Sequence, residues 1–236
     1  MNSPPLTDTP VSAAALVQMG RQPGPFVLAL DGQTDPAALL DCHEVVRAIP
    51  GRRLVCRGAW RGRDVFIKLY LDGGKHWQVE CRGLQALADK GIAAPAVLHA
   101  GTADCGALHV IVLEAIQPAV TLETALSQAH EEEARIALLQ QAIVCIASHH
   151  CAGLEQRDIH LNNFLLAGEC LYTLDGGGIH DAGVPDLPVQ SSCDNLALFY
   201  AELYPDDDAL IEKLLPVYLQ RRAWDSEVLP LAMFYQ

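Results

Sequence analysis

The sequence contains no apolar run of the ~20 residues that a membrane-spanning helix needs. Its longest apolar stretch, residues 108–116, is strand-sized and is interrupted by polar residues. Residues 1–20 carry no basic residue ahead of their short apolar segment, which argues against a secretory signal. We therefore expect a cytoplasmic protein without a transmembrane span.

Paired cysteine motifs are also missing. The eight cysteines are scattered, without a C-x-x-C pattern, which is typical of reduced, mostly buried thiols. His149, His150 and Cys151 form the one metal-suggestive cluster, but consecutive residues at a helix end point in different directions and no second half-site has ligand spacing. The sequence therefore disfavours a structural zinc site.

Positive charge is scarce: the sequence has 16 basic and 29 acidic residues, and its net charge is −13. Nucleic-acid binding needs a basic surface, so we expect no nucleic-acid partner. The same charge weakens docking to an anionic membrane. An apolar fraction of 50% with 19% charged residues indicates a globular chain, and 236 residues allow one two-lobed domain or two small ones.

Extended segments dominate residues 43–117. EVVRAI, LVCRGAW and DVFIKLYL, separated by short turns, predict a three-stranded antiparallel meander. A helix follows within residues 76–95, with Gly91 as its C-terminal cap, and residues 96–101 and 107–116 predict two further strands. We therefore expect an α+β fold with a five-stranded antiparallel sheet carrying one helix. An arm with short helices, one of them near residues 11–19, precedes it in residues 1–42, and a mostly helical lobe follows in residues 118–236.

Lys68 lies in the third strand of that meander, and alternation places it on the face opposite Ile67 and Leu69. Glu80 follows twelve residues later on the helix. A strand lysine paired with a helix glutamate orients an ammonium group toward nucleotide phosphates. Alternatively, Lys68 extends to solvent and Glu80 is a solvated carboxylate on the face of the helix. The spacing alone leaves both interpretations open.

The stretch LEQRDIHLNNFLLAGECLYTLDGGGI, residues 154–179, follows an amphipathic helix at residues 131–154. It places Asp158, Asn163 and Asp175 in a predicted loop, hairpin and glycine turn. Oxygen ligands of this kind suit Mg²⁺, which is usually held by one or two carboxylates and by substrate phosphates. A carboxylate at the loop start can accept a proton from an attacking hydroxyl. Each residue alone is also a common turn former.

With these five polar residues in order, the sequence resembles the protein-kinase-like fold. More closely, it is similar to the bacterial lipopolysaccharide core kinases, the heptose and Kdo kinases, over roughly residues 43–220. VFIKLYL, the helix motif E-x-x-G-L-x-x-L ending in GIAAP, and RDIHLNNFLL carry the resemblance. It implies a two-lobed kinase-like fold with a short catalytic hairpin in the C-terminal lobe, and it implies ATP and Mg²⁺ as cofactors.

The resemblance also implies roles for single residues. Lys68 contacts the α- and β-phosphates and Glu80 anchors Lys68. Asp158 is the catalytic base, and Asn163 and Asp175 hold magnesium.

Further residues are expected near these. His160 either helps to neutralise the transferring phosphoryl group or orders the loop by hydrogen bonding. Backbone groups from Glu114 to Ile116 are expected to meet the adenine edge. By the resemblance, Asp194 braces the catalytic loop from below, or it caps the helix that follows.

The sequence departs from the kinase pattern in several places. There is no G-x-G-x-x-G, so phosphate covering depends on the short turn at Gly51 with Arg52 or Arg53. Gln156 stands where protein kinases usually carry His, and Gly176 replaces the Phe of D-F-G. Only 61 residues follow Asp175, without A-P-E.

These departures favour a small-molecule or glycolipid acceptor over a protein. The leading hypothesis is phosphoryl transfer to a sugar hydroxyl of the lipopolysaccharide inner core, with peripheral contact to the inner membrane left open. One alternative is a kinase-like binding or regulatory pseudoenzyme. The other is a small-molecule kinase of the amino-alcohol or aminoglycoside type.

Overall fold

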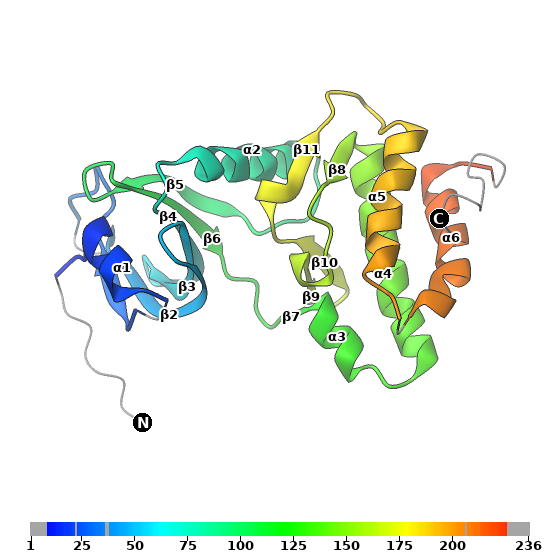
Figure 1. The fold of residues 1–236 in the computed structure, drawn as a ribbon, viewed down its shortest axis with the longest axis horizontal. Coiled ribbons are helices and arrows are strands. Elements are labelled where there is room, and N and C mark those ends of the chain that lie inside the picture. Colours follow the sequence, from blue (N-terminus) through cyan, green and yellow to red (C-terminus); the bar gives the residue numbers. More distant parts are fainter. Residues whose placement is uncertain (1–8, 22, 36–37, 206, 226–236) are drawn as a thin grey trace. The chain divides into compact units, whose positions relative to one another are not determined.

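The computed structural model describes residues 9–225 except residues 22, 36–37 and 206. The chain divides into two compact units (Figure 1). The first comprises Met1–Cys81 and Pro95–Ile116, and the second comprises Arg82–Ala94 and Gln117–Gln236. The second half of the helix predicted at residues 76–95 therefore belongs to the second unit.

Within its described residues, the first unit contains one antiparallel sheet of six strands in the order β1-β2-β3-β4-β6-β5. The strands are β1 (Phe26–Leu28), β2 (Leu40–Ile49), β3 (Arg53–Trp60), β4 (Arg63–Tyr70), β5 (Val97–Ala103) and β6 (Leu108–Glu114). Along β3 and β4, buried residues alternate with more exposed ones. This period of two is the pattern of a strand that packs one face on a core.

The sheet has one strand more than the five expected, and it begins inside the predicted arm of residues 1–42. β1 pairs with the start of β2, with Phe26 opposite Cys42. All three residues of β1 are buried, so pairing at the edge of β2 removes their apolar side chains from water. The predicted short helix is present as α1 (Ala13–Met19), where the Ser12 hydroxyl accepts a hydrogen bond from the Ala15 amide at 3.2 Å.

Helix α2 (Lys75–Asp89) connects β4 to β5. It ends just before Gly91, which has a φ of +67° and lies where the sequence predicts a C-terminal cap. Residues up to Cys81 belong to the first unit, and residues from Arg82 belong to the second.

The second unit is mostly helical (Figure 1). Its helices are α3 (Leu122–Gln128), α4 (Glu132–Cys151), α5 (Val189–Ala201) and α6 (Ile211–Arg222). Its short strands are β7 (Val120–Thr121), β8 (Leu154–Gln156), β9 (Phe164–Ala167), β10 (Cys170–Thr173) and β11 (Ile179–Asp181). β9 and β10 form the predicted hairpin, and β11 pairs with β8. Apolar residues of α4, α5 and α6 form the core.

Candidate active site

Lys68 and Glu80 form an ion pair in the first unit. The Glu80 side chain is 1% exposed and that of Lys68 is 12% exposed. A solvated helix-face carboxylate is therefore excluded for Glu80. A carboxylate removed from water needs a cationic partner, and the Lys68 ammonium supplies it. Ile67 and Leu69 are fully buried on the opposite face of β4.

The sheet register places an arginine on the same face as Lys68. Val55 lies opposite Lys68, and Arg53 lies opposite Tyr70. Since side chains of opposed residues share a face and alternate along a strand, Arg53 is on the Lys68 side. Arg52, in the β2–β3 turn, instead bonds His76 at 3.1 Å. Of the two arginines expected to cover phosphates, the register favours Arg53.

The segment expected to meet adenine follows β6. The Glu114 amide donates to the Ala96 carbonyl at 2.9 Å, and the Ala115 amide donates to the Asp64 carbonyl at 3.3 Å. Within the described part of the chain, Ile116 makes no backbone hydrogen bond. Its N–H and C=O groups, like the Ala115 carbonyl, are therefore not used by backbone pairing among these residues.

Asp158 and Asn163 are joined directly in the second unit. The Asn163 Nδ2 group donates to the Asp158 carbonyl at 2.8 Å, and the Asn163 amide donates to the His160 carbonyl at 2.8 Å. The Asn163 carbonyl in turn accepts from the Leu174 amide at 2.9 Å. Asp175 therefore directly follows Leu174, which is hydrogen-bonded to Asn163.

The glycine turn after Asp175 packs against both the loop and helix α2. Asp175 Oδ1 accepts from the Gly177 amide at 3.1 Å and caps the short 3-10 helix η3 (Gly176–Gly178). A Cβ at Gly178 would lie 3.1 Å from the Asp158 Cβ, and a Cβ at Gly83 would lie 1.8 Å from the Gly176 carbonyl oxygen. Glycine at positions 83 and 178 thus permits close approach of the Asp175 turn to its neighbours.

These donors suit magnesium. Asn163 Nδ2 is bonded to the Asp158 carbonyl, so its Oδ1 is the amide atom that could coordinate a cation, and Asp175 could add a carboxylate oxygen. One carboxylate and one amide oxygen, completed by phosphates and water, is the kind of set that Mg²⁺ takes. In the described residues, no three His, Cys, Asp or Glu side chains form a group that could hold a metal ion.

His160 lies at the start of a second 3-10 helix, η2 (Leu161–Asn163). Its Nδ1 atom accepts from the Asn162 amide at 3.2 Å and lies 3.7 Å from Glu202 Oε2. The Asn162 side chain is also held, because its Nδ2 group donates to Glu123 Oε2 at 2.7 Å. These contacts support the loop-ordering reading of His160.

The prediction for Asp194 is wrong. Helix α5 begins at Val189, so Asp194 is not its cap, and the exposed Asp194 carboxylate accepts from Gln190 Nε2 at 2.8 Å. The residue that braces the loop is the next one. The buried Asn195 donates through Nδ2 to the Gln156 carbonyl at 2.8 Å, because one step along a helix turns the side chain by about 100° toward the core.

Asn195 belongs to a buried polar network that the sequence analysis missed. Its Oδ1 lies 3.0 Å from His150 Nε2, and His150 Nδ1 lies 2.7 Å from the Tyr218 hydroxyl. Burial lowers the pKa of His150 to about 4, so its imidazole is neutral and donates to Asn195 while it accepts from Tyr218. A lone amide on the apolar stripe of α5, beside Leu196 and Phe199, was the available sequence signal.

The sequence model of the lipopolysaccharide kinase (Kdo/WaaP) family matches residues 71–173. Over these residues the chain is similar to this family of kinases. The resemblance inferred from the sequence and the prediction of a kinase are thereby confirmed. No curated protein sequence matches the chain.

Two solved structures show the same fold as this kinase. WaaP in complex with acyl carrier protein aligns with a TM-score of 0.55 and 23% identity over 76% of this chain and 77% of that chain. The BubR1 kinase domain aligns with a TM-score of 0.54 and 14% identity over 78% of this chain and 55% of that chain. The predicted kinase-like α+β fold is therefore confirmed. Among the described helices, none is long and apolar enough to cross a membrane.

Proposed function

We propose that this kinase is an ATP- and Mg²⁺-dependent phosphotransferase that acts on a sugar hydroxyl of the lipopolysaccharide inner core. One observation carries the proposal. Glu80, Asp158 and Asn163 all lie inside the segment that matches the lipopolysaccharide kinase family, Glu80 pairs with Lys68, and Asn163 is hydrogen-bonded to the Asp158 backbone. Lys68 and Asp175 flank that segment directly.

Each residue has a defined task in this proposal. Lys68, held by Glu80, binds the α- and β-phosphates, and Asp158 accepts the proton of the attacking hydroxyl. Asn163 and Asp175 hold the metal ion, which neutralises charge on the transferring phosphoryl group when it is bound. His160 keeps the loop in place through Asn162.

The family match supports this choice of acceptor. A glycolipid acceptor implies a cytoplasmic enzyme that contacts the inner membrane peripherally, and no nucleic-acid partner is proposed.

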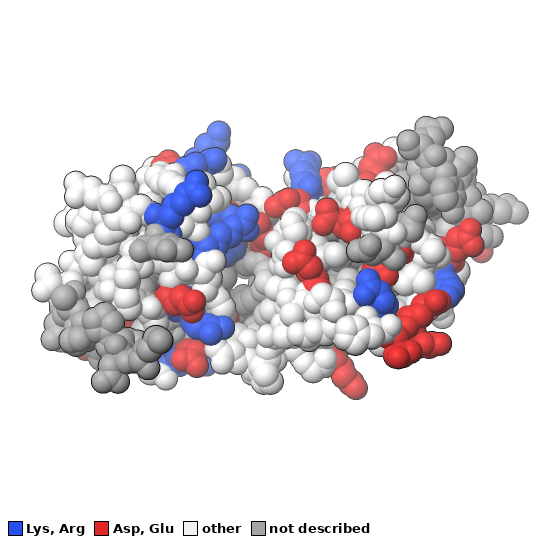
Figure 2. All heavy atoms as spheres, turned by 60° about the horizontal axis from the view of Figure 1, so that its bottom comes forward, with Lys and Arg blue, Asp and Glu red and all other residues white. Residues whose placement is uncertain are grey.

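The units differ in charge, since the sequence of the first has nine basic and ten acidic residues and that of the second has seven basic and nineteen acidic residues. On the face drawn in Figure 2, acidic side chains lie over much of the second unit.

That acidity favours a second candidate, a small-molecule kinase for a cationic acceptor such as an amino-alcohol or an aminoglycoside. Like charges repel an anionic acceptor and attract a cationic one. Measuring ADP release with lipopolysaccharide core, neutral sugars and amino-alcohols, each as the sole acceptor, separates the two. Turnover with amino-alcohols alone would rule out the inner-core assignment.

Two variants test the chemistry. Asp158→Asn keeps Mg-ATP binding and loses turnover, because only the proton acceptor is removed. Asp175→Ala loses the Mg²⁺-dependent part of nucleotide binding as well. Binding is read from the rise of Tm on addition of Mg-ATP, since a ligand of the folded state must stabilise it, and turnover is read from ADP release. Full activity of Asp158→Asn would disprove the role of Asp158, and wild-type protein without any Mg-ATP shift would indicate a pseudoenzyme.

A further inference from the structure

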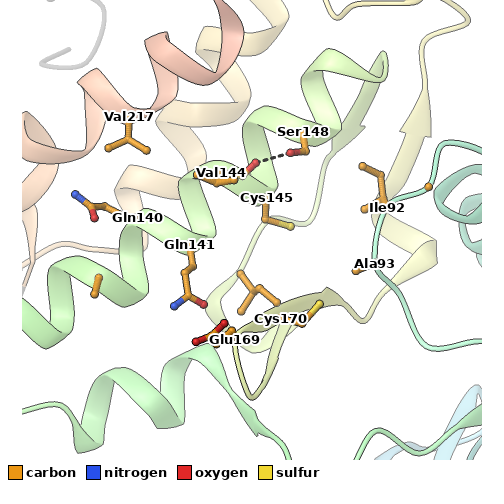
Figure 3. Close-up of a pocket in the computed structure, with 13 residues that line it drawn as sticks. Ile92, Ala93, Gln140, Gln141, Val144, Cys145, Ser148, Glu169, Cys170 and Val217 are labelled. Atoms are coloured by element: carbon orange, nitrogen blue, oxygen red, sulfur yellow. Dashed lines mark hydrogen bonds between the residues drawn. The ribbon is translucent and has the colours of Figure 1, made fainter.

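A pocket of about 520 Å³ lies on the second unit, apart from the residues proposed for phosphoryl transfer. Its wall is built from the segment after α2, from α4, from the β9–β10 hairpin and from α6 (Figure 3). Its volume falls within the range of about 300–1,000 Å³ that small-molecule sites occupy. Neither Asp158, Asn163 nor Asp175 lines it, so its occupancy is independent of the proposed function.

Most of the wall is apolar. Ile92, Val144, Leu171 and Val217 contribute branched side chains. Val144 is 40% exposed, although it lies on the helix that forms the core of this unit. An apolar ligand body laid on these side chains would remove them from water, which is favourable.

The polar end of the pocket contains two acceptors. Gln141 Oε1 is buried and has no hydrogen-bond partner, and Figure 3 shows its amide and the Glu169 carboxylate pointing toward one another. Two acceptors in such an arrangement need a donor between them. Rotation of the Gln141 amide, which would let Nε2 donate to Glu169, is the alternative that the experiment below tests.

The charge of the ligand follows from the remaining wall. No Lys, Arg or His is among the residues that line the pocket, and the Arg221 guanidinium that contacts the lining Ser148 donates to its Oγ at 3.3 Å. Glu169 is exposed and belongs to the strongly acidic second unit. A cation is therefore preferred over a neutral molecule, and a neutral molecule over an anion.

We propose that this pocket binds a small organic monoammonium compound, with its apolar body against Val144, Ile92 and Val217 and its ammonium N–H groups donating to Gln141 Oε1 and Glu169. The site is an accessory ligand site and takes no part in the transfer of the phosphoryl group.

Fluorine NMR with three matched probes tests this on the full-length protein. The probes are para-fluorophenethylamine, the corresponding para-fluorophenyl ethanol and the corresponding para-fluorophenyl propanoate. We expect the amine to show line broadening that saturates on titration, weaker broadening for the alcohol and none for the carboxylate. Equal broadening for all three, or none for the amine, would overturn the proposal.

Variants locate the site and identify the polar contact. Val144→Trp fills the pocket and should abolish the saturable broadening, whereas Val189→Trp should leave it unchanged. The control is matched, because Val189 is 41% exposed on α5 and does not line the pocket. Glu169→Gln should weaken amine binding by up to about fivefold, since it removes one exposed ion pair. Unchanged binding in Val144→Trp or in Glu169→Gln would contradict the proposed site or its polar contact, and would favour the rotated Gln141 amide in the second case.

Discussion

Gly83→Ala is the substitution that most directly tests how the Asp175 turn is held. In an exposed helix interior, replacing glycine by alanine stabilises the protein by about 1 kcal/mol. Here the new Cβ would lie 1.8 Å from the oxygen and 2.7 Å from the carbon of the Gly176 carbonyl, whereas ordinary contacts begin at 3.4 Å. Both partners are main chain, so no flexible side chain can relieve the overlap.

The overlap is large enough to reverse the sign of the effect. Overpacking of this kind costs about 1–3 kcal/mol or more, which exceeds the gain in helix propensity. We therefore expect a net loss of about 1–2 kcal/mol, or about 2–8 °C in Tm at about 2–4 °C per kcal/mol. The overlap displaces Gly176 and therefore also Asp175, which precedes it in the chain. Because Asp175 is a proposed metal ligand, the rise in Tm on addition of Mg-ATP should become smaller as well.

Gly24→Ala is the matched control. Gly24 has no atom within 4 Å of its Cβ position and no positive φ, so alanine there should be neutral or slightly stabilising. The measurements are thermal unfolding with and without Mg-ATP. A Gly83→Ala protein as stable as wild type, with an unchanged response to Mg-ATP, would refute the close approach of α2 to the turn.

Two other predictions concern the polar interior of the second unit. Asn195→Ala should lower the free energy of unfolding by about 2–3 kcal/mol, because it leaves the Gln156 carbonyl and His150 without their partner. Asp194 is exposed, so Asp194→Ala should leave the free energy of unfolding within about 0.5 kcal/mol of wild type in denaturant unfolding. Equal losses of stability in the two variants would contradict the assignment of Asn195 as the residue that braces the loop. Burial lowers the pKa of His149 to about 3 and that of His150 to about 4 from the ordinary value of 6.5. The unfolded chain therefore takes up protons first, and the stability present above pH 6.5 should fall by about 1.4 kcal/mol per pH unit and per histidine as the pH drops toward about 4. Urea unfolding at a series of pH values measures this slope, and an unchanged slope in His149→Gln would argue against a neutral buried His149.

Several features follow from the sequence alone, because they depend on residues close together in the chain. The alternation around Lys68 fixed its face on β4, and the buried Ile67 and Leu69 agree with it. The Thr121 cap of α3 is equally local, because its hydroxyl accepts from the amide of Thr124 at 3.2 Å, three residues along the chain. Asp158 and Asn163 lie five residues apart, and a loop of that length brings them together through its own hydrogen bonds.

Other features were decided by tertiary structure, since they join segments far apart in the chain. The sequence marked E-x-x-G as part of the kinase resemblance, but only packing against Gly176 explains the glycine at position 83. Asp194 and Asn195 are equally polar in sequence, and the rotation of α5 against the core selects Asn195 as the brace. The accessory pocket has no sequence signal at all, because four distant segments contribute its wall. Residue spacing thus specified the local chemistry, and long-range packing determined which glycine and which amide support it and where the separate pocket forms.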